Sequence, residues 1–147
     1  CLHDALPISL RSMMNAQPSL ETPGPLRVFL VEDSPIVLER LEAMLASIAG
    51  ALPAGHAARA DEAIQAILAE RPDAVVLDLK LAEGSGFDVL RAVRGAAPGI
   101  DVYMLTNFAS EPYRRLAERL GARDLFDKTT EFERVREAIL DRTGQAH

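Results

Sequence analysis

Short runs of apolar residues alternate along this chain with longer stretches in which apolar residues recur every three or four positions. A short, almost wholly apolar run is typical of a strand buried on both faces, and the longer period is typical of an amphipathic helix. We predict strands at residues 26–31, 52–57, 74–78, 101–105 and 124–126. We predict helices at roughly residues 35–49, 61–71, 87–95, 110–120 and 131–142.

The predicted order is a strand followed by a helix, five times over. Parallel strands need crossover connections, and helices supply them here. The pattern therefore predicts the α/β class, with a flavodoxin-like, doubly wound (βα)5 sandwich and a parallel five-stranded sheet in the order 2-1-3-4-5. Pro53 and Gly55 interrupt the second strand. This suits the edge position that the order assigns to it.

One domain, residues 26–143, accounts for the regular pattern, and residues 144–147 form a C-terminal tail. Residues 1–25 contain four prolines and no sustained period, so we expect a disordered leader. Residues 4–9 resemble a translated sequencing adapter. We hypothesise that the residues before Met13 or Met14 are not native.

Composition narrows the class of protein. A net charge of −6 argues against general nucleic-acid binding, which needs basic surface to meet phosphates. No run approaches the roughly 18 to 20 apolar residues that span a bilayer. The single cysteine, Cys1, cannot form an internal disulfide. We expect a cytoplasmic protein without direct contact with nucleic acid or membrane.

Polar side chains follow four of the predicted strands. Glu32 and Asp33 follow the first strand, Asp78 ends the third, Thr106 follows the fourth, and Lys128 comes shortly after the fifth. The carboxyl ends of parallel strands meet at one edge of a sheet, where such folds bind ligands. Three carboxylates, a hydroxyl and an ammonium suit a magnesium-dependent phosphoryl acceptor.

Residues 26–142 resemble the receiver domain of bacterial two-component response regulators. The similarity rests on motifs that stand in order at the strand ends: VEDS at 31–34, VLDL at 76–79, LT at 105–106, GA at 121–122 and DK at 127–128. By this resemblance Mg²⁺ is held by the carboxylates of Glu32, Asp33 and Asp78 and by the backbone carbonyl of Lys80.

The resemblance also implies a catalytic role for three residues. Asp78 is the phosphoacceptor, Thr106 hydrogen-bonds a phosphoryl oxygen, and Lys128 pairs with the acceptor carboxylate or the phosphoryl group. Self-catalysed hydrolysis of the aspartyl phosphate follows, tuned by Lys80 and Phe108, so the protein is not expected to be a turnover enzyme.

Some positions depart from the family pattern. Leu125 stands where an aromatic switch residue is usual, and Phe126 beside it should point to the opposite face. Thr129 stands where a proline usually follows the lysine. Asn107 replaces a small residue, and Ala82 replaces a common proline. We expect these differences to affect the conformational switch more than the phosphoryl transfer.

The expected function is two-component signal transduction by a stand-alone receiver, as a switch, a phosphorelay intermediate or a phosphate sink. The expected partners are a sensor histidine kinase or phosphotransfer protein and a downstream protein. The downstream protein would bind the surface formed by the helix at 110–120, the strand at 124–126 and the helix at 131–142. A basic cluster in this region is either solvated or part of that surface: Arg114, Arg115, Arg119 and Arg123.

Other functions remain open on sequence grounds. A pseudo-receiver would bind partners without phosphorylation, and the chain could be a fragment of a longer regulator or hybrid kinase. A hydrolase with an aspartyl nucleophile is disfavoured, because Lys80 stands where its second carboxylate would be expected. The glycines of Gly84-Ser85-Gly86 do not continue into a nucleotide-binding motif.

Overall fold

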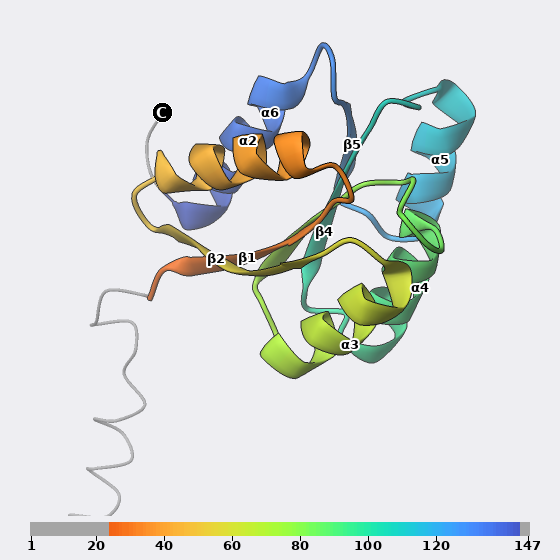
Figure 1. The fold of residues 1–147 in the computed structure, drawn as a ribbon, viewed down its shortest axis with the longest axis horizontal. Coiled ribbons are helices and arrows are strands. Elements are labelled where there is room, and N and C mark those ends of the chain that lie inside the picture. Colours follow the sequence, from red (N-terminus) through yellow and green to blue (C-terminus); the bar gives the residue numbers. More distant parts are fainter. Residues whose placement is uncertain (1–23, 145–147) are drawn as a thin grey trace, which may run out of the picture.

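The computed structural model describes residues 24–144, so almost all of the expected leader lies outside the described residues. Strands and helices alternate throughout this part of the chain (Figure 1). Their order and bounds are β1 Leu26–Val31, α2 Pro35–Ala46, β2 Ala51–Ala57, α3 Ala60–Glu70, β3 Ala74–Leu77, α4 Gly86–Ala96, β4 Asp101–Thr106, α5 Glu111–Arg119, β5 Asp124–Asp127 and α6 Phe132–Thr143.

The strands form one parallel sheet in the order β2-β1-β3-β4-β5, which confirms the predicted fold. Helices α2 and α6 cover one face, and α3, α4 and α5 cover the other (Figure 1). Alternate strand residues face opposite layers. In β1, Val28 and Leu30 pack in the α2–α6 layer, whereas Phe29 and Val31 pack in the α3–α5 layer.

The interrupted second strand lies at the sheet edge, as predicted. Its pairing with β1 shifts register between Val28, which faces Pro53, and Phe29, which faces Gly55. Gly55 has a φ of 138°, and a Cβ there would lie 2.9 Å from the Phe29 ring. The irregularity therefore lets the edge strand pass over a core aromatic side chain without leaving the sheet.

The first helix is shorter than its apolar spacing predicts. It ends at Ala46 instead of continuing to residue 49, and Ser47 forms its C-cap. The backbone N–H of Ser47 donates to the carbonyl of Ala43, and its hydroxyl donates to the carbonyl of Met44 at 2.6 Å. Ile48 is nevertheless buried, so the apolar period continues past the helix because the following turn packs on the core. No other boundary differs from the prediction by more than one residue. None of the helices between residues 24 and 144 is both long and apolar enough to cross a membrane.

Gly86 brings the start of α4 against the end of β3. Its N–H donates to the carbonyl of Leu79 at 2.7 Å. A Cβ at this position would collide with the carbonyl oxygen of Asp78 and would lie 2.9 Å from the Cα of Leu79. Ser85 caps the helix, and Asp88 accepts the N–H of Ser85 in return, which completes a capping box. Only glycine fits between this helix and the Asp78 backbone.

We predict that Gly86→Ala lowers the free energy of unfolding by about 1–3 kcal/mol, because the added methyl group must displace the Asp78 backbone. Gly95→Ala is the matched control in the same helix. Apart from its chain neighbours and the nearby backbone of its own helix, no atom lies within 4 Å of its Cβ position. That change should stabilise the helix slightly, by up to about 1 kcal/mol. Urea unfolding measures both. Equal stability of the two variants would contradict the close approach at Gly86.

Candidate functional site

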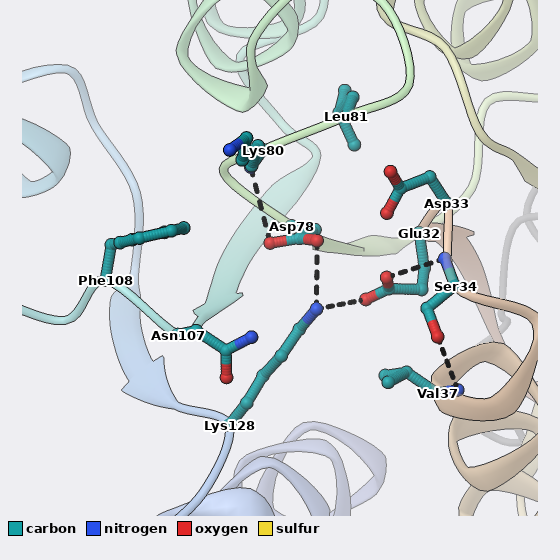
Figure 2. A pocket seen from close by; sticks show the side chains of 10 residues that line it. All are labelled: Glu32, Asp33, Ser34, Val37, Asp78, Lys80, Leu81, Asn107, Phe108 and Lys128. Atoms are coloured by element: carbon teal, nitrogen blue, oxygen red, sulfur yellow. Dashed lines mark hydrogen bonds and ion pairs between the residues drawn. The ribbon is translucent and has the colours of Figure 1, made fainter.

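The carboxyl ends of β1, β3 and β5 and the loop after β4 surround one pocket of about 310 Å³ (Figure 2). Because the strands are parallel, all four segments reach the same edge of the sheet. The residues that line the pocket are Glu32, Asp33, Ser34, Val37, Asp78, Lys80, Leu81, Asn107, Phe108 and Lys128. Every predicted site residue except Thr106 is among them.

Three carboxylates converge in the pocket. Glu32 and Asp78 are buried, whereas Asp33 is exposed. One oxygen from each lies within 4.8 Å of the others, which is close enough for the three to share a metal ion. The three face a common space in Figure 2. Hard oxygen ligands of this kind suit Mg²⁺ or Ca²⁺ rather than a soft metal.

The ammonium group of Lys128 lies between the two buried carboxylates. Its Nζ is 2.8 Å from Glu32 Oε1 and 2.9 Å from Asp78 Oδ2 (Figure 2). Desolvation lowers the pKa of Lys128, but the hydrogen bonds to Glu32 and Asp78 and the negative charges of these two residues together outweigh it, so the pKa is raised overall. The lysine therefore remains a cation and offsets part of the repulsion between the two acids.

Burial raises the pKa of Glu32 above its ordinary value of 4.5, and the nearby charge of Asp78 adds to this. The hydrogen bonds from Lys128 and from the N–H of Ser34 act in the opposite direction. Ser34 donates to Glu32 Oε2 at 3.0 Å. The Ser34 hydroxyl in turn accepts the N–H of Val37 and caps α2. One turn thus begins the helix and orients the carboxylate. The contact between Ser34 and Glu32 was not predicted from the sequence.

The opposite wall of the pocket combines a cation and an aromatic ring. The backbone N–H of Lys80 lies 3.4 Å from Asp78 Oδ1, and the Lys80 side chain is exposed. Its ammonium lies 5.8 Å from the centroid of the Phe108 ring. Figure 2 shows both side chains on the far side of Asp78 from Glu32. They flank the approach to the Asp78 carboxylate.

Thr106 does not line the pocket. It is fully buried, and its hydroxyl accepts the N–H of Phe108 at 3.0 Å. Asn107 and Phe108 line the pocket in its place. The carbonyl of Thr106 accepts the N–H of Lys128 at 2.9 Å. Thr106 therefore supports the wall that carries Asn107 and Phe108 and the backbone that carries Lys128.

The residues in and after β5 that depart from the expected motif are well defined in the structure. Leu125 is buried in the α3–α5 layer and Phe126 in the α2–α6 layer, which confirms that they point to opposite faces. No cis peptide bond occurs between residues 24 and 144, so the Lys128–Thr129 bond is trans. The N–H of Thr129 donates to Asp127 Oδ1 at 2.7 Å, which shapes the loop that a proline would otherwise restrict.

The sequence left open whether the basic cluster is solvated or part of a binding surface, and solvation alone does not describe Arg114, whose side chain is only partly exposed. Its guanidinium donates to the carbonyl of Leu125 at 2.7 Å and to Glu131 Oε1 at 2.9 Å. These bonds join α5 to β5 and to the start of α6. The sequence grouped Arg114 with three other arginines in one basic cluster, and nothing local indicated its partners across the strand. Arg123, which was grouped with it, lies 3.9 Å from Asp101 and remains mostly exposed.

The chain is similar in sequence to proteins of one known family. A family model described as the response regulator receiver domain matches residues 28–140. The probable transcriptional regulatory protein TcrX of Mycobacterium tuberculosis is 33% identical over 123 residues, which cover 82% of this chain and 52% of TcrX. The chain spans about half the length of the curated relatives it matches, including DctR of Bacillus subtilis at 50%.

Solved structures agree with this match. The BeF3-activated receiver domain of RstA from Klebsiella pneumoniae is 30% identical, with a TM-score of 0.67, and covers 77% of this chain and 97% of its own. The receiver domain of NarL from Mycobacterium tuberculosis has a TM-score of 0.76 at 23% identity and covers 84% of this chain and 100% of its own. The likeness to NarL concerns the fold alone.

We predict that Lys128→Met destabilises the protein by about 2 kcal/mol at pH 7 in metal-free buffer, because Glu32 then stays buried and charged without a cation. The loss should shrink as the pH falls through the raised pKa of Glu32 towards 4.5, since protonation removes the buried charge. Urea unfolding between pH 7 and pH 4 measures it.

The matched control is Arg91→Met, which removes an exposed ion pair with Asp88. It should change stability by less than about 0.5 kcal/mol, with no comparable pH trend. A loss for Lys128→Met that stayed constant across this range would show that the charge of Glu32 is not its cause.

Proposed function

The chain belongs to the family of response regulator receiver domains, and we propose that it accepts a phosphoryl group from a phosphohistidine onto Asp78 in a magnesium-dependent reaction. The observation that carries this proposal is the Asp78 carboxylate itself. It lies in the pocket beside two further carboxylates and 2.9 Å from the Lys128 ammonium. A nucleophile, a candidate metal site and a fixed cation are thus gathered around one point.

In the proposed transfer, a carboxylate oxygen of Asp78 attacks phosphorus. The phosphorus–nitrogen bond of the phosphohistidine breaks, and the imidazole nitrogen leaves with the electron pair. Negative charge is spread over the phosphoryl oxygens during such a transfer, so catalysis consists mainly of positioning and charge stabilisation. Lys128 supplies a positive charge that is already in place and already desolvated, with its side chain only 10% exposed.

The donor set fits magnesium. Glu32, Asp33 and Asp78 offer carboxylate oxygens, and Asp33 is exposed, so water molecules can complete an octahedral shell. The backbone carbonyl of Lys80 is the fourth ligand that we propose. When bound, the ion supplies positive charge for the carboxylates and for the incoming phosphoryl oxygens. Both oxygens of Glu32 already accept hydrogen bonds, from Lys128 and Ser34, and both oxygens of Asp78 have partners in Lys128 and the N–H of Lys80. The exposed Asp33 is therefore the carboxylate with the fewest competing contacts.

Thr106 is proposed to contact the phosphoryl group after transfer. Its oxygen accepts the N–H of Phe108, so its own O–H proton stays available for donation. Because Asn107 and Phe108 line the pocket whereas Thr106 is fully buried and does not, this contact is proposed to need a movement of the segment after β4. Lys80 and Phe108, which flank Asp78, are proposed to set the rate at which the aspartyl phosphate hydrolyses. The protein would then be a self-limiting phosphoacceptor and not a turnover enzyme.

The proposed donor is a sensor histidine kinase or phosphotransfer protein. The transfer is proposed to take place in the cytoplasm, where ATP is available to phosphorylate the donor histidine. The proposed receiver of the signal is a protein that binds the surface formed by α5, β5 and α6. Two loops support this surface as the output. The loop with Asn107 and Phe108 leads into α5, and the loop with Lys128 leads into α6. Changes at the pocket would therefore shift the populations of the alternative positions of both helices.

We predict that acetyl phosphate and Mg²⁺ add one phosphoryl group to the protein and that Asp78→Asn or EDTA prevents it. Intact-mass spectrometry measures the gain, and hydroxylamine should remove it, since an acyl phosphate is labile to this nucleophile. The matched control is Asp61→Asn, which removes a carboxylate on α3 outside the pocket and should be phosphorylated like the wild type. An unmodified wild type would favour a pseudo-receiver. Labelling of Asp78→Asn would assign the acceptor to another residue.

We predict that Asp33→Asn weakens Mg²⁺ binding by about tenfold or more, because the exposed carboxylate is the ligand with the fewest competing contacts. Isothermal titration calorimetry measures the affinity, and Mg²⁺ should raise the melting temperature of the wild type in parallel. Asp61→Asn again serves as the control. Unchanged affinity in Asp33→Asn would remove Asp33 from the proposed ligand set.

A further inference from the structure

The loop that carries Lys128 is closed on itself. The N–H of Glu131 donates to the carbonyl of Asp127 at 2.8 Å, and the carboxylate of Glu131 accepts the N–H of Asp127 at 2.9 Å. Within the loop, the N–H groups of Thr129 and Thr130 donate to Asp127 Oδ1 at 2.7 and 3.1 Å. The course of the backbone at Lys128 is therefore set by the residues on either side of it.

Arg114 holds this loop from the neighbouring helix. One arm of its guanidinium donates to the carbonyl of Leu125 at 2.7 Å, and the other reaches the same Glu131 oxygen that accepts the N–H of Asp127. The N–H of Asp127 and the guanidinium of Arg114 keep the pKa of Glu131 below its ordinary value of 4.5. We call this arrangement the Arg114–Glu131 clasp.

The geometry points to a positioning role for the clasp. We propose that Arg114 and Glu131 hold Lys128 in register with Glu32 and Asp78, and this rests on the phosphoacceptor function proposed above. Neither clasp residue lines the pocket, so the clasp acts through the backbone of Asp127. The ammonium of Lys128 is within 3 Å of both carboxylates. A small rotation of the loop would break at least one of these contacts.

The clasp depends on a forked cation. Its two acceptors are a backbone carbonyl on β5 and a side chain at the start of α6, and a guanidinium reaches both at once, whereas a lysine ammonium is a single point charge. Arg114→Lys should therefore recover only part of the effect of Arg114. The chain also offers a control on the same carboxylate. Arg134 contacts Glu131 Oε2 at 2.8 Å from the exposed side. Its guanidinium lies 5.7 Å from the centroid of the Phe126 ring, but it donates no hydrogen bond to the β5 backbone within residues 24–144 and so does not complete the clasp.

The first experiment measures the position of Lys128 without any phosphoryl chemistry. The chain has two lysines, Lys80 and Lys128, and Lys80 is exposed. Brief treatment with acetic anhydride, followed by peptide mass spectrometry, gives the acylation rate of Lys128 relative to Lys80. Loss of the clasp in Arg114→Ala or Glu131→Gln should raise this ratio about three- to tenfold, the factor expected for one or two lost hydrogen bonds. Arg134→Ala should leave it unchanged.

The second experiment measures the consequence for phosphorylation. The initial rate with acetyl phosphate and Mg²⁺ should fall about three- to tenfold in Arg114→Ala and hardly change in Arg134→Ala. A double-mutant cycle with Lys128→Ala separates positioning from general destabilisation. If the clasp acts through Lys128, Arg114→Ala should have no further effect once Lys128 is gone. Urea unfolding confirms that each variant is folded under the assay conditions.

The outcomes are distinct. A clasp variant that leaves the acylation ratio unchanged overturns the positioning role, whatever the phosphorylation result. An equal loss of rate in the presence and absence of Lys128 also overturns it, because the clasp would then act only on the fold. If the wild type is not phosphorylated but Arg114→Ala still raises the acylation ratio, the phosphoacceptor function is overturned. The clasp would then still position Lys128.

Discussion

The contact of the Lys128 ammonium with Glu32 and Asp78 is the interaction on which the pocket depends. Two buried carboxylates close to one another repel strongly where water is scarce, and a cation between them offsets that repulsion. The three residues come from the ends of β1, β3 and β5. The contact therefore forms only when β1, β3 and β5 all occupy their correct places in the sheet.

Backbone contacts supply most of the rigidity around this charge cluster. The N–H of Ser34 fixes Glu32, the carbonyl of Thr106 fixes the backbone of Lys128, and the close approach of Gly86 fixes the backbone of Asp78. Each of these contacts lies at a point where a strand ends or a helix begins. The elements of the fold thus position the charged groups, which keeps the side chains from collapsing onto other partners.

The same pocket is joined to the outer surface through two loops. The segment after β4 leads into α5 and the loop after β5 leads into α6, and the guanidinium of Arg114 bonds across β5 from one to the other. Leu125, which the resemblance would have as an aromatic switch residue, is instead buried among the α3–α5 core side chains. Polar contacts through Arg114 are therefore the direct link that the described residues provide between these two helices at β5.

The sequence by itself determined the alternation of strands and helices, the edge position of β2 and the convergence of Glu32, Asp33, Asp78 and Lys128. Each of these follows from local patterns and from the rule that parallel strands end at one edge. Only the tertiary structure decided that Thr106 is buried and does not line the pocket, that Arg114 bonds across β5 and that Gly86 lies directly against the backbone of Asp78. These depend on distances in space between side chains and backbone that the fold brings together, and residue type and periodicity carry no measure of such distances.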